Sequence, residues 1–110
     1  MAWLCREDGE VLASLEIAEN VGARTRGLLG RDGIEGALLL RPAKSVHTIG
    51  MRFAIDVAFV DRDMVVLRTV TMSRFRLGRP VLKAHAVIEA EAGVFGHWNL
   101  HVGDKLEIKG

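Results

Sequence analysis

The chain has one cysteine, two prolines, no tyrosine and no long apolar run. Because Cys5 stands alone, an intrachain disulfide is excluded, which agrees with a reducing cytoplasm. A membrane span needs about 18 consecutive apolar residues, and no such stretch occurs. The first residues carry no basic region followed by an apolar run, so we expect no secretory signal. These absences together predict a soluble, cytoplasmic protein.

A large excess of charge of one sign is also missing. The 15 basic and 14 acidic side chains leave a formal net charge of +1, which disfavours a strongly basic nucleic-acid-binding protein. Residues 64–85 nevertheless hold five basic residues and no acidic one, with Phe75 between Arg74 and Arg76. Arginines around an aromatic ring are typical of single-stranded nucleic-acid binding. Because aromatic residues are scarce, a solvated basic face is the better interpretation of Arg68–Lys83.

The composition is that of a globular protein. Apolar residues make up 49% and charged residues 26% of the 110 residues, which is enough to build one core without disulfides or metals. No internal repeat, low-complexity segment or linker divides the chain. We therefore expect a single domain over residues 1–110.

Short strands separated by glycine and polar turns dominate the pattern. Asp8-Gly9 is a strong hairpin signal because glycine tolerates positive φ. Asp61–Asp63 forms a second polar turn between two apolar runs. The strands expected from period-two or continuous apolar patterns are Ala2–Arg6, Val11–Ile17, Gly36–Leu40, Phe53–Val60, Met64–Met72, Val81–Glu91 and Lys105–Lys109.

Helical signals are few. Asn20 is typical of a helix N-cap and predicts a helix over Val21–Leu29 that stops at Gly30. One helical turn is expected within Gly93–Leu100. The chain shows none of the long crossover helices that parallel strands require. The expected fold class is therefore α+β, a mostly antiparallel β-sheet or small β-barrel with one or two short helices.

Asp56 interrupts the most apolar predicted strand. If this carboxylate points inward, it must be paired or hydrogen-bonded, because an isolated buried charge is very costly. Its candidate partners are Arg52, Arg24, Arg26 or the backbone N–H groups of a nearby loop. Asp56 could then orient a ligand or act as a general base. The alternative, which is favoured, is a structural anchor that ties a loop to the sheet.

Other candidate residues precede this strand on a loop. His47, beside the hydroxyl of Thr48, could perform acid–base chemistry or bind a metal, or could be a surface histidine bonded to a carbonyl. Met51 could line a pocket or fill the core. His97 and His101 have the spacing of zinc ligands on a helix, but no cysteine-rich or glutamate-rich partner lies near them. We therefore expect no metal.

Familiar catalytic and cofactor-binding motifs are missing. The chain contains no Gly-x-Ser-x-Gly elbow, no P-loop and no dinucleotide-binding fingerprint. Cys5, in a predicted strand next to Arg6, is better interpreted as a small buried apolar residue than as a nucleophile. We therefore expect no cofactor.

Several segments in order along the chain carry a family resemblance. Arg24–Arg31, Val46–Asp61, Ile88–Gly93 and Gly103-Asp104 together resemble domain-of-unknown-function family 192, a group of small uncharacterised prokaryotic proteins. The resemblance implies a compact, β-barrel-like α+β domain of bacterial origin. It implies no established catalytic activity.

Three functions follow from these features. The leading hypothesis is a non-catalytic binding or accessory domain, with an arginine-, aspartate- and histidine-lined pocket for a small anionic ligand or a protein partner. An alternative is a small hydrolase-type enzyme with His47 and Asp56 as its acid–base pair. Single-stranded nucleic-acid binding through Arg68–Lys83 is the third. The candidate ligand-binding residues are Arg24, Arg31, His47, Thr48, Met51, Arg52 and Asp56.

Overall fold

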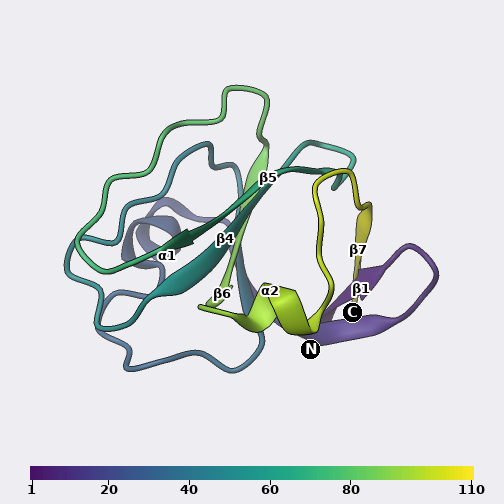
Figure 1. Ribbon diagram of the computed structural model, residues 1–110, viewed down its shortest axis with the longest axis horizontal. Helices are drawn as coiled ribbons and strands as arrows, with labels where there is room; N and C mark the ends of the chain where they lie inside the picture. Colours follow the sequence, from purple (N-terminus) through teal and green to yellow (C-terminus); the bar gives the residue numbers. More distant parts are fainter.

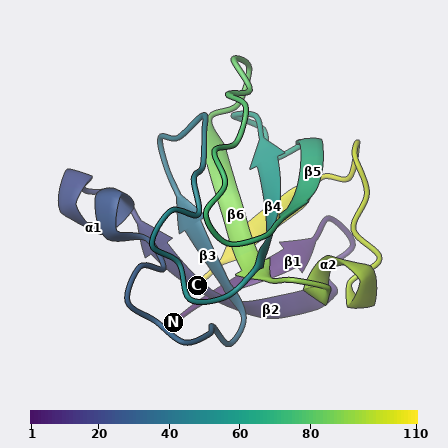
Figure 2. The same cartoon turned by 60° about the vertical axis from the view of Figure 1, so that its left-hand side comes forward.

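Seven strands form one curled sheet, with two short helices at its margins (Figures 1 and 2). The computed structural model describes all residues, 1–110. The strands lie in the order β5-β4-β6-β3-β2-β1-β7. The elements are β1 (Ala2–Arg6), β2 (Val11–Ala18), α1 (Val21–Arg26), β3 (Ala37–Leu40), β4 (Ile55–Val60), β5 (Val66–Met72), β6 (Ala86–Glu91), α2 (Val94–His97) and β7 (Leu106–Lys109).

The expected α+β class is confirmed, and so are both predicted hairpins. β1 pairs antiparallel with β2, and β4 pairs antiparallel with β5. β6 lies between β3 and β4 and is antiparallel to both. The sheet is mostly antiparallel, as expected, and one pair departs from this pattern: β2 and β3 are parallel. Residues 19–36 form the crossover connection between these two strands, and this connection includes the six-residue helix α1.

The first helix is shorter than predicted. Asn20 caps it as expected, and its side chain accepts a hydrogen bond from the Ala23 N–H at 2.7 Å. The helix ends at Arg26 because Gly27 takes a φ of 48° and serves as the C-cap, where the predicted stop was Gly30. Gly27 and Gly30 both take a positive φ, as a glycine that ends a helix commonly does. The sequence alone therefore does not show at which of them the helix ends.

Apolar residues pack on both faces of the sheet. Along β4, Ile55, Val57 and Phe59 belong to one buried cluster, whereas Ala58 and Val60 belong to the other. We call the first the loop face, since Leu28 and Met51 cover it from the connecting segments. The second is the helix face, where Phe95 of α2 packs with residues of the curled β1, β2 and β7. Because side chains alternate along a strand, a one-residue step decides which face a polar side chain meets.

The curl brings the two edges of the sheet together at one end. An isolated bridge joins Val65 to Lys105, and the N–H of Val66 donates to the carbonyl of Asp104 at 2.8 Å. The Gly103 N–H in turn donates to the carbonyl of Val66 at 2.8 Å. The sheet is therefore a half-barrel in which the second half of β5 keeps a free edge.

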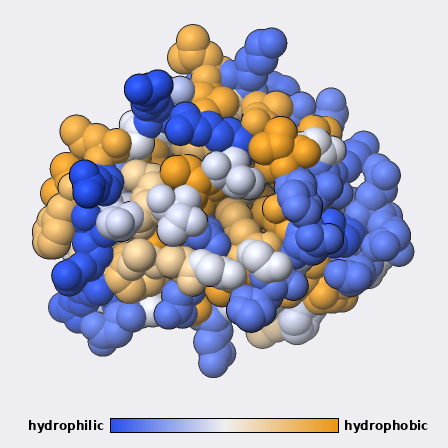
Figure 3. Space-filling view, in the orientation of Figure 1, coloured by the Kyte–Doolittle hydropathy of each residue, from blue (hydrophilic) through white to orange (hydrophobic).

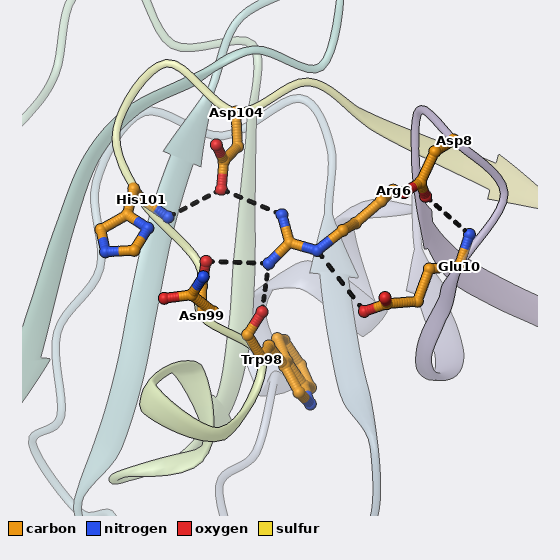
Figure 4. A network of polar contacts seen from close by, with 7 residues as sticks. All are labelled: Arg6, Asp8, Glu10, Trp98, Asn99, His101 and Asp104. Carbon is orange, nitrogen blue, oxygen red and sulfur yellow. Dashed lines mark hydrogen bonds and ion pairs between the residues drawn. The ribbon is translucent and has the colours of Figure 1, made fainter.

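Arg6, the last residue of β1, ties the first hairpin to the segment before β7 (Figure 4). Its guanidinium donates to Asp104 Oδ2 at 3.2 Å and to the backbone carbonyls of Trp98 and Asn99. Asp104 also accepts the His101 N–H at 2.8 Å. That backbone hydrogen bond lowers the pKa of Asp104; partial burial opposes the effect, and the guanidinium of Arg6 adds to it.

Neither helix has the length and apolar run that crossing a bilayer requires.

Candidate functional site

A cleft of about 220 Å³ opens on the loop face of the sheet, beside the C-terminal end of α1. We call it the α1 cleft. The end of α1 with Gly27–Leu29, the loop segment 45–47 with Met51, and Leu77-Gly78 surround it, and Leu40 and Glu89 line it from the sheet. Its polar side chains come from three separate parts of the chain, and they are Arg24, Thr25, Arg26, Ser45, His47 and Glu89.

Glu89 is the buried carboxyl of this cleft. Alternation along β6 places it on the same face as Val87, which belongs to the loop-face cluster. The residue is 5% exposed, and burial alone raises the pKa of its carboxyl from 4.5 to about 7. Burial removes the water that stabilises the charged carboxylate, which disfavours its ionisation. A buried carboxyl that faces a cleft and changes charge near neutral pH is typical of a functional site.

Arg24 contributes the second unsatisfied group. It lies in the last turn of α1, and one of its terminal nitrogens donates to the carbonyl of Pro42 at 2.9 Å. Its Nε is buried and has no hydrogen-bond partner. Buried polar groups are almost always paired, so the unpartnered Nε sets Arg24 apart among the residues that line the cleft.

Two further predicted residues line the α1 cleft. His47 is exposed at its rim, and Met51 is buried in its wall. Thr48, between them, does not line the cleft. Its hydroxyl donates to the carbonyl of Ser73 at 2.6 Å and accepts the Arg76 N–H at 2.8 Å, so it joins the two loops that form the rim.

The remaining predicted arginines lie elsewhere. Arg31 forms an ion pair with Glu16 at 2.7 Å, and Arg52 forms one with Asp32 at 3.1 Å. Neither of them lines the α1 cleft. Of the three arginines that the sequence predicted to line the pocket, only Arg24 lines the α1 cleft.

Asp56 lies on the other face of the sheet. It is 3% exposed, and its carboxylate accepts the N–H groups of Gly93 at 2.9 Å and Phe95 at 3.0 Å and the hydroxyl of Thr71 at 2.6 Å. Backbone N–H groups were among the partners expected for it, whereas no arginine contacts it. Because His47 lines the α1 cleft and Asp56 does not, the two side chains do not form an acid–base pair in one cavity.

Comparison with known proteins places the chain in a family. A family model named DUF192 and described as "Uncharacterized ACR" matches residues 4–108. The chain belongs to the DUF192 family. A UPF0127 protein from Pyrococcus abyssi is 30% identical over 98 residues, which is 84% of each chain. Another, from Pyrococcus furiosus, is 28% identical over 103 residues, or 89% of each chain.

Solved structures support the fold of this DUF192 protein. A protein of unknown function from Novosphingobium aromaticivorans superposes with a TM-score of 0.79 at 20% identity, covering 96% of this chain and 82% of that one. A candidate transcription regulator from Sinorhizobium meliloti gives 0.80 at 17% identity, covering 96% and 90%. At these identities the likeness concerns the fold alone.

The sequence-based site of the DUF192 chain missed Glu89. An acidic residue within the apolar run Ala86–Ala90 is the same signal that drew attention to Asp56. No group of three or more His, Cys, Asp or Glu side chains lies close enough together to hold a metal ion. What the α1 cleft offers a ligand is therefore positive charge, one buried carboxyl and apolar walls.

Proposed function

We propose that this DUF192 protein is a non-catalytic binding domain that takes a small organic anion in the α1 cleft. The observation that carries the proposal is the guanidinium of Arg24, which pairs with no carboxylate and has an unpartnered Nε, in a cleft that also contains the buried carboxyl of Glu89. The cleft holds about 220 Å³, below the usual range of about 300–1,000 Å³ for drug-sized ligands. A carboxylate on a compact apolar body fits that size.

The charges of the cleft favour an anion. Arg24 and Arg26 supply two guanidinium groups, and the exposed His47 stands at the rim. Hydrogen bonds between guanidinium and carboxylate are charge-assisted and stronger than neutral ones. The carboxyl of Glu89 binds together with such a ligand in its protonated form, in which it donates a hydrogen bond instead of repelling the anion.

This arrangement couples binding to protons. The ligand raises the proton affinity of Glu89, so its own affinity falls as the pH rises above about 7, where the carboxyl ionises. Glu89→Gln keeps a neutral donor at every pH and removes this coupling, whereas His47→Gln should leave it in place.

The experiment is a titration of the ¹⁵N-labelled protein with benzoate and butyrate at low ionic strength, followed by amide chemical shifts. We expect saturable shifts in residues 24–29 and 45–47 that weaken about tenfold or more in Arg24→Gln, since a charge-assisted hydrogen bond contributes about 1.5 kcal/mol or more. Arg31→Gln is the matched control, because Arg31 lies outside the cleft. Equal weakening in both variants, or shifts confined to other segments, would refute the proposal.

The hydrolase hypothesis receives no support from the geometry, because its two residues lie apart. If the same surface instead binds a protein partner, that partner would shift the amide signals of the α1 cleft, and benzoate and butyrate would not.

A further inference from the structure

A second cleft, of about 330 Å³, lies on the other side of the segment Leu77-Gly78. Both clefts touch these two residues and share no others. The second one runs along the free edge of the sheet, where its floor is Phe59, Val70 and Met72. Its remaining lining residues are polar, and they are Arg68, Thr71, Ser73, Arg76 and Arg79. We call it the arginine cleft.

Three arginines share this cleft without a counterion. No acidic residue lines it, and none of the ion pairs of the protein involves Arg68, Arg76 or Arg79. By contrast, Arg6, Arg31, Arg41 and Arg52 each pair with a carboxylate. Like charges gathered in a concave surface with an apolar floor create a local positive potential that attracts anions.

The backbone holds these arginines in place. Arg68 lies on β5, which pairs along its length with β4. The backbone of Arg76 is fixed twice by Thr48: the Arg76 N–H donates to the Thr48 hydroxyl at 2.8 Å, and the Thr48 N–H donates to the Arg76 carbonyl at 2.8 Å. The Gly78 N–H donates to the Val46 carbonyl at 2.9 Å. The chain at Arg76 and Gly78 is therefore held against the neighbouring loop.

Gly78 is required for this close approach. A Cβ at this position would lie 2.6 Å from the Val46 carbonyl oxygen, so any side chain would push the segment away from its partner loop. This contact fixes the wall between the two clefts. The separation means that each cleft can bind its own ligand.

We propose that the arginine cleft binds the phosphate group of a small phosphorylated molecule, with the apolar floor receiving part of its organic body. Guanidinium groups match phosphate oxygens in bidentate geometry, and three of them suit a dianion better than a single carboxylate. The hydroxyl of Ser73 adds a donor at the same wall. The volume falls within the range of small-ligand sites, about 300–1,000 Å³.

A single-stranded nucleic acid fits these observations less well. Stacking of bases needs exposed aromatic rings, and near this cleft only Phe75 is exposed, at 65%. Its ring is already covered in part by Arg74, whose guanidinium carbon lies 5.7 Å from the ring centre. Neither residue lines the cleft. Apolar side chains do reach the surface over the loops on the left of the molecule, but as separate patches between polar ones (Figure 3).

The test is a titration with inorganic phosphate and with phenyl phosphate at low ionic strength, followed by amide chemical shifts. We expect saturable shifts in residues 68–73 and 76–79, tighter binding of phenyl phosphate, and about tenfold or greater weakening in Arg68→Gln and in Arg79→Gln. Both side chains are exposed, so these variants keep the fold, which the unperturbed spectrum verifies. Arg74→Gln, on the same loop but outside the cleft, should bind as the unmodified protein does.

Two results would overturn the proposal. The first is the absence of saturable shifts at millimolar phosphate. The second is stronger binding of an oligothymidylate than of phenyl phosphate, together with its loss in Phe75→Ala, which would assign the surface to single-stranded nucleic acid. Arg24→Gln should leave phosphate binding unchanged, so failure here is distinguishable from failure of the α1 cleft to bind benzoate.

Discussion

Glu89→Gln should make the protein more stable at neutral and alkaline pH. Burial raises the pKa of Glu89 from 4.5 to about 7 in the folded chain, whereas in the unfolded chain the carboxyl is exposed to water and regains its ordinary value. Between these two pH values the folded state holds a proton that the unfolded state has released. The free energy of unfolding therefore falls as the pH rises through this window and becomes constant above it.

The size of the effect follows from the width of the window. The interval from 4.5 to about 7, at about 1.4 kcal/mol per pH unit, corresponds to about 3 kcal/mol of stability lost by the native protein. Glutamine has nearly the same shape and cannot ionise, so Glu89→Gln avoids this loss. At pH 8 the variant should exceed the native protein by about 3 kcal/mol, and near pH 4.5 the two should be about equal.

Urea unfolding at pH 4.5, 6, 7 and 8, followed by tryptophan fluorescence, measures this difference. Glu91→Gln is the matched control, because Glu91 lies on the same strand but is exposed. Its stability should follow that of the native protein at every pH. Parallel pH profiles for the native protein and Glu89→Gln would show that the carboxyl is not desolvated in the folded state and would refute the reasoning.

Four other substitutions test the fold around the sites. Asp56→Asn should cost about 2 to 3 kcal/mol in urea unfolding without weakening benzoate binding, because its buried carboxylate accepts three hydrogen bonds on the helix face; Thr71→Val, which removes one of them, should cost about 1 kcal/mol. Asp104→Asn should reduce the fall in melting temperature that the native protein shows below about pH 4, because a carboxylate with a lowered pKa contributes stability that is lost in acid. The same fall in melting temperature in both proteins would contradict this. Gly36→Ala should lower stability by at least about 1 to 2 kcal/mol, since its φ is 73° and a Cβ would lie 2.4 Å from the Ser14 carbonyl oxygen; a melting temperature equal to that of the native protein would refute the packing at this point.

Local chemistry made much of the fold predictable. The Asp8-Gly9 turn fixes the first hairpin because Gly9 takes a φ of 95°, and the side chain of Asn20 begins α1 by accepting a backbone N–H. These features depend on a few neighbouring residues. The parallel pairing of β2 with β3 was not foreseen, because it depends on how residues 19–36 pack and not on a local signal.

The site was less predictable for a related reason. Asp56 and Glu89 are both acidic residues within apolar strands, and nothing local separates their roles. Asp56 meets the N–H groups of the α2 turn on the helix face, whereas Glu89 meets an open cleft on the loop face. The difference arises from long-range packing over the two faces of one sheet. In the same way, only the tertiary structure separates Arg24, with its unpaired Nε, from the ion-paired Arg31.

The most direct test of the proposed function is the proton balance of benzoate binding at pH 7.5. Calorimetric titration in two buffers of different ionisation enthalpy measures the number of protons taken up with the ligand. Net uptake is expected in the native protein and in His47→Gln, and its loss is expected in Glu89→Gln, since Glu89 must be protonated beside a bound anion. Benzoate binding without proton uptake, or uptake that persists in Glu89→Gln, would contradict the assignment of the α1 cleft as the anion site.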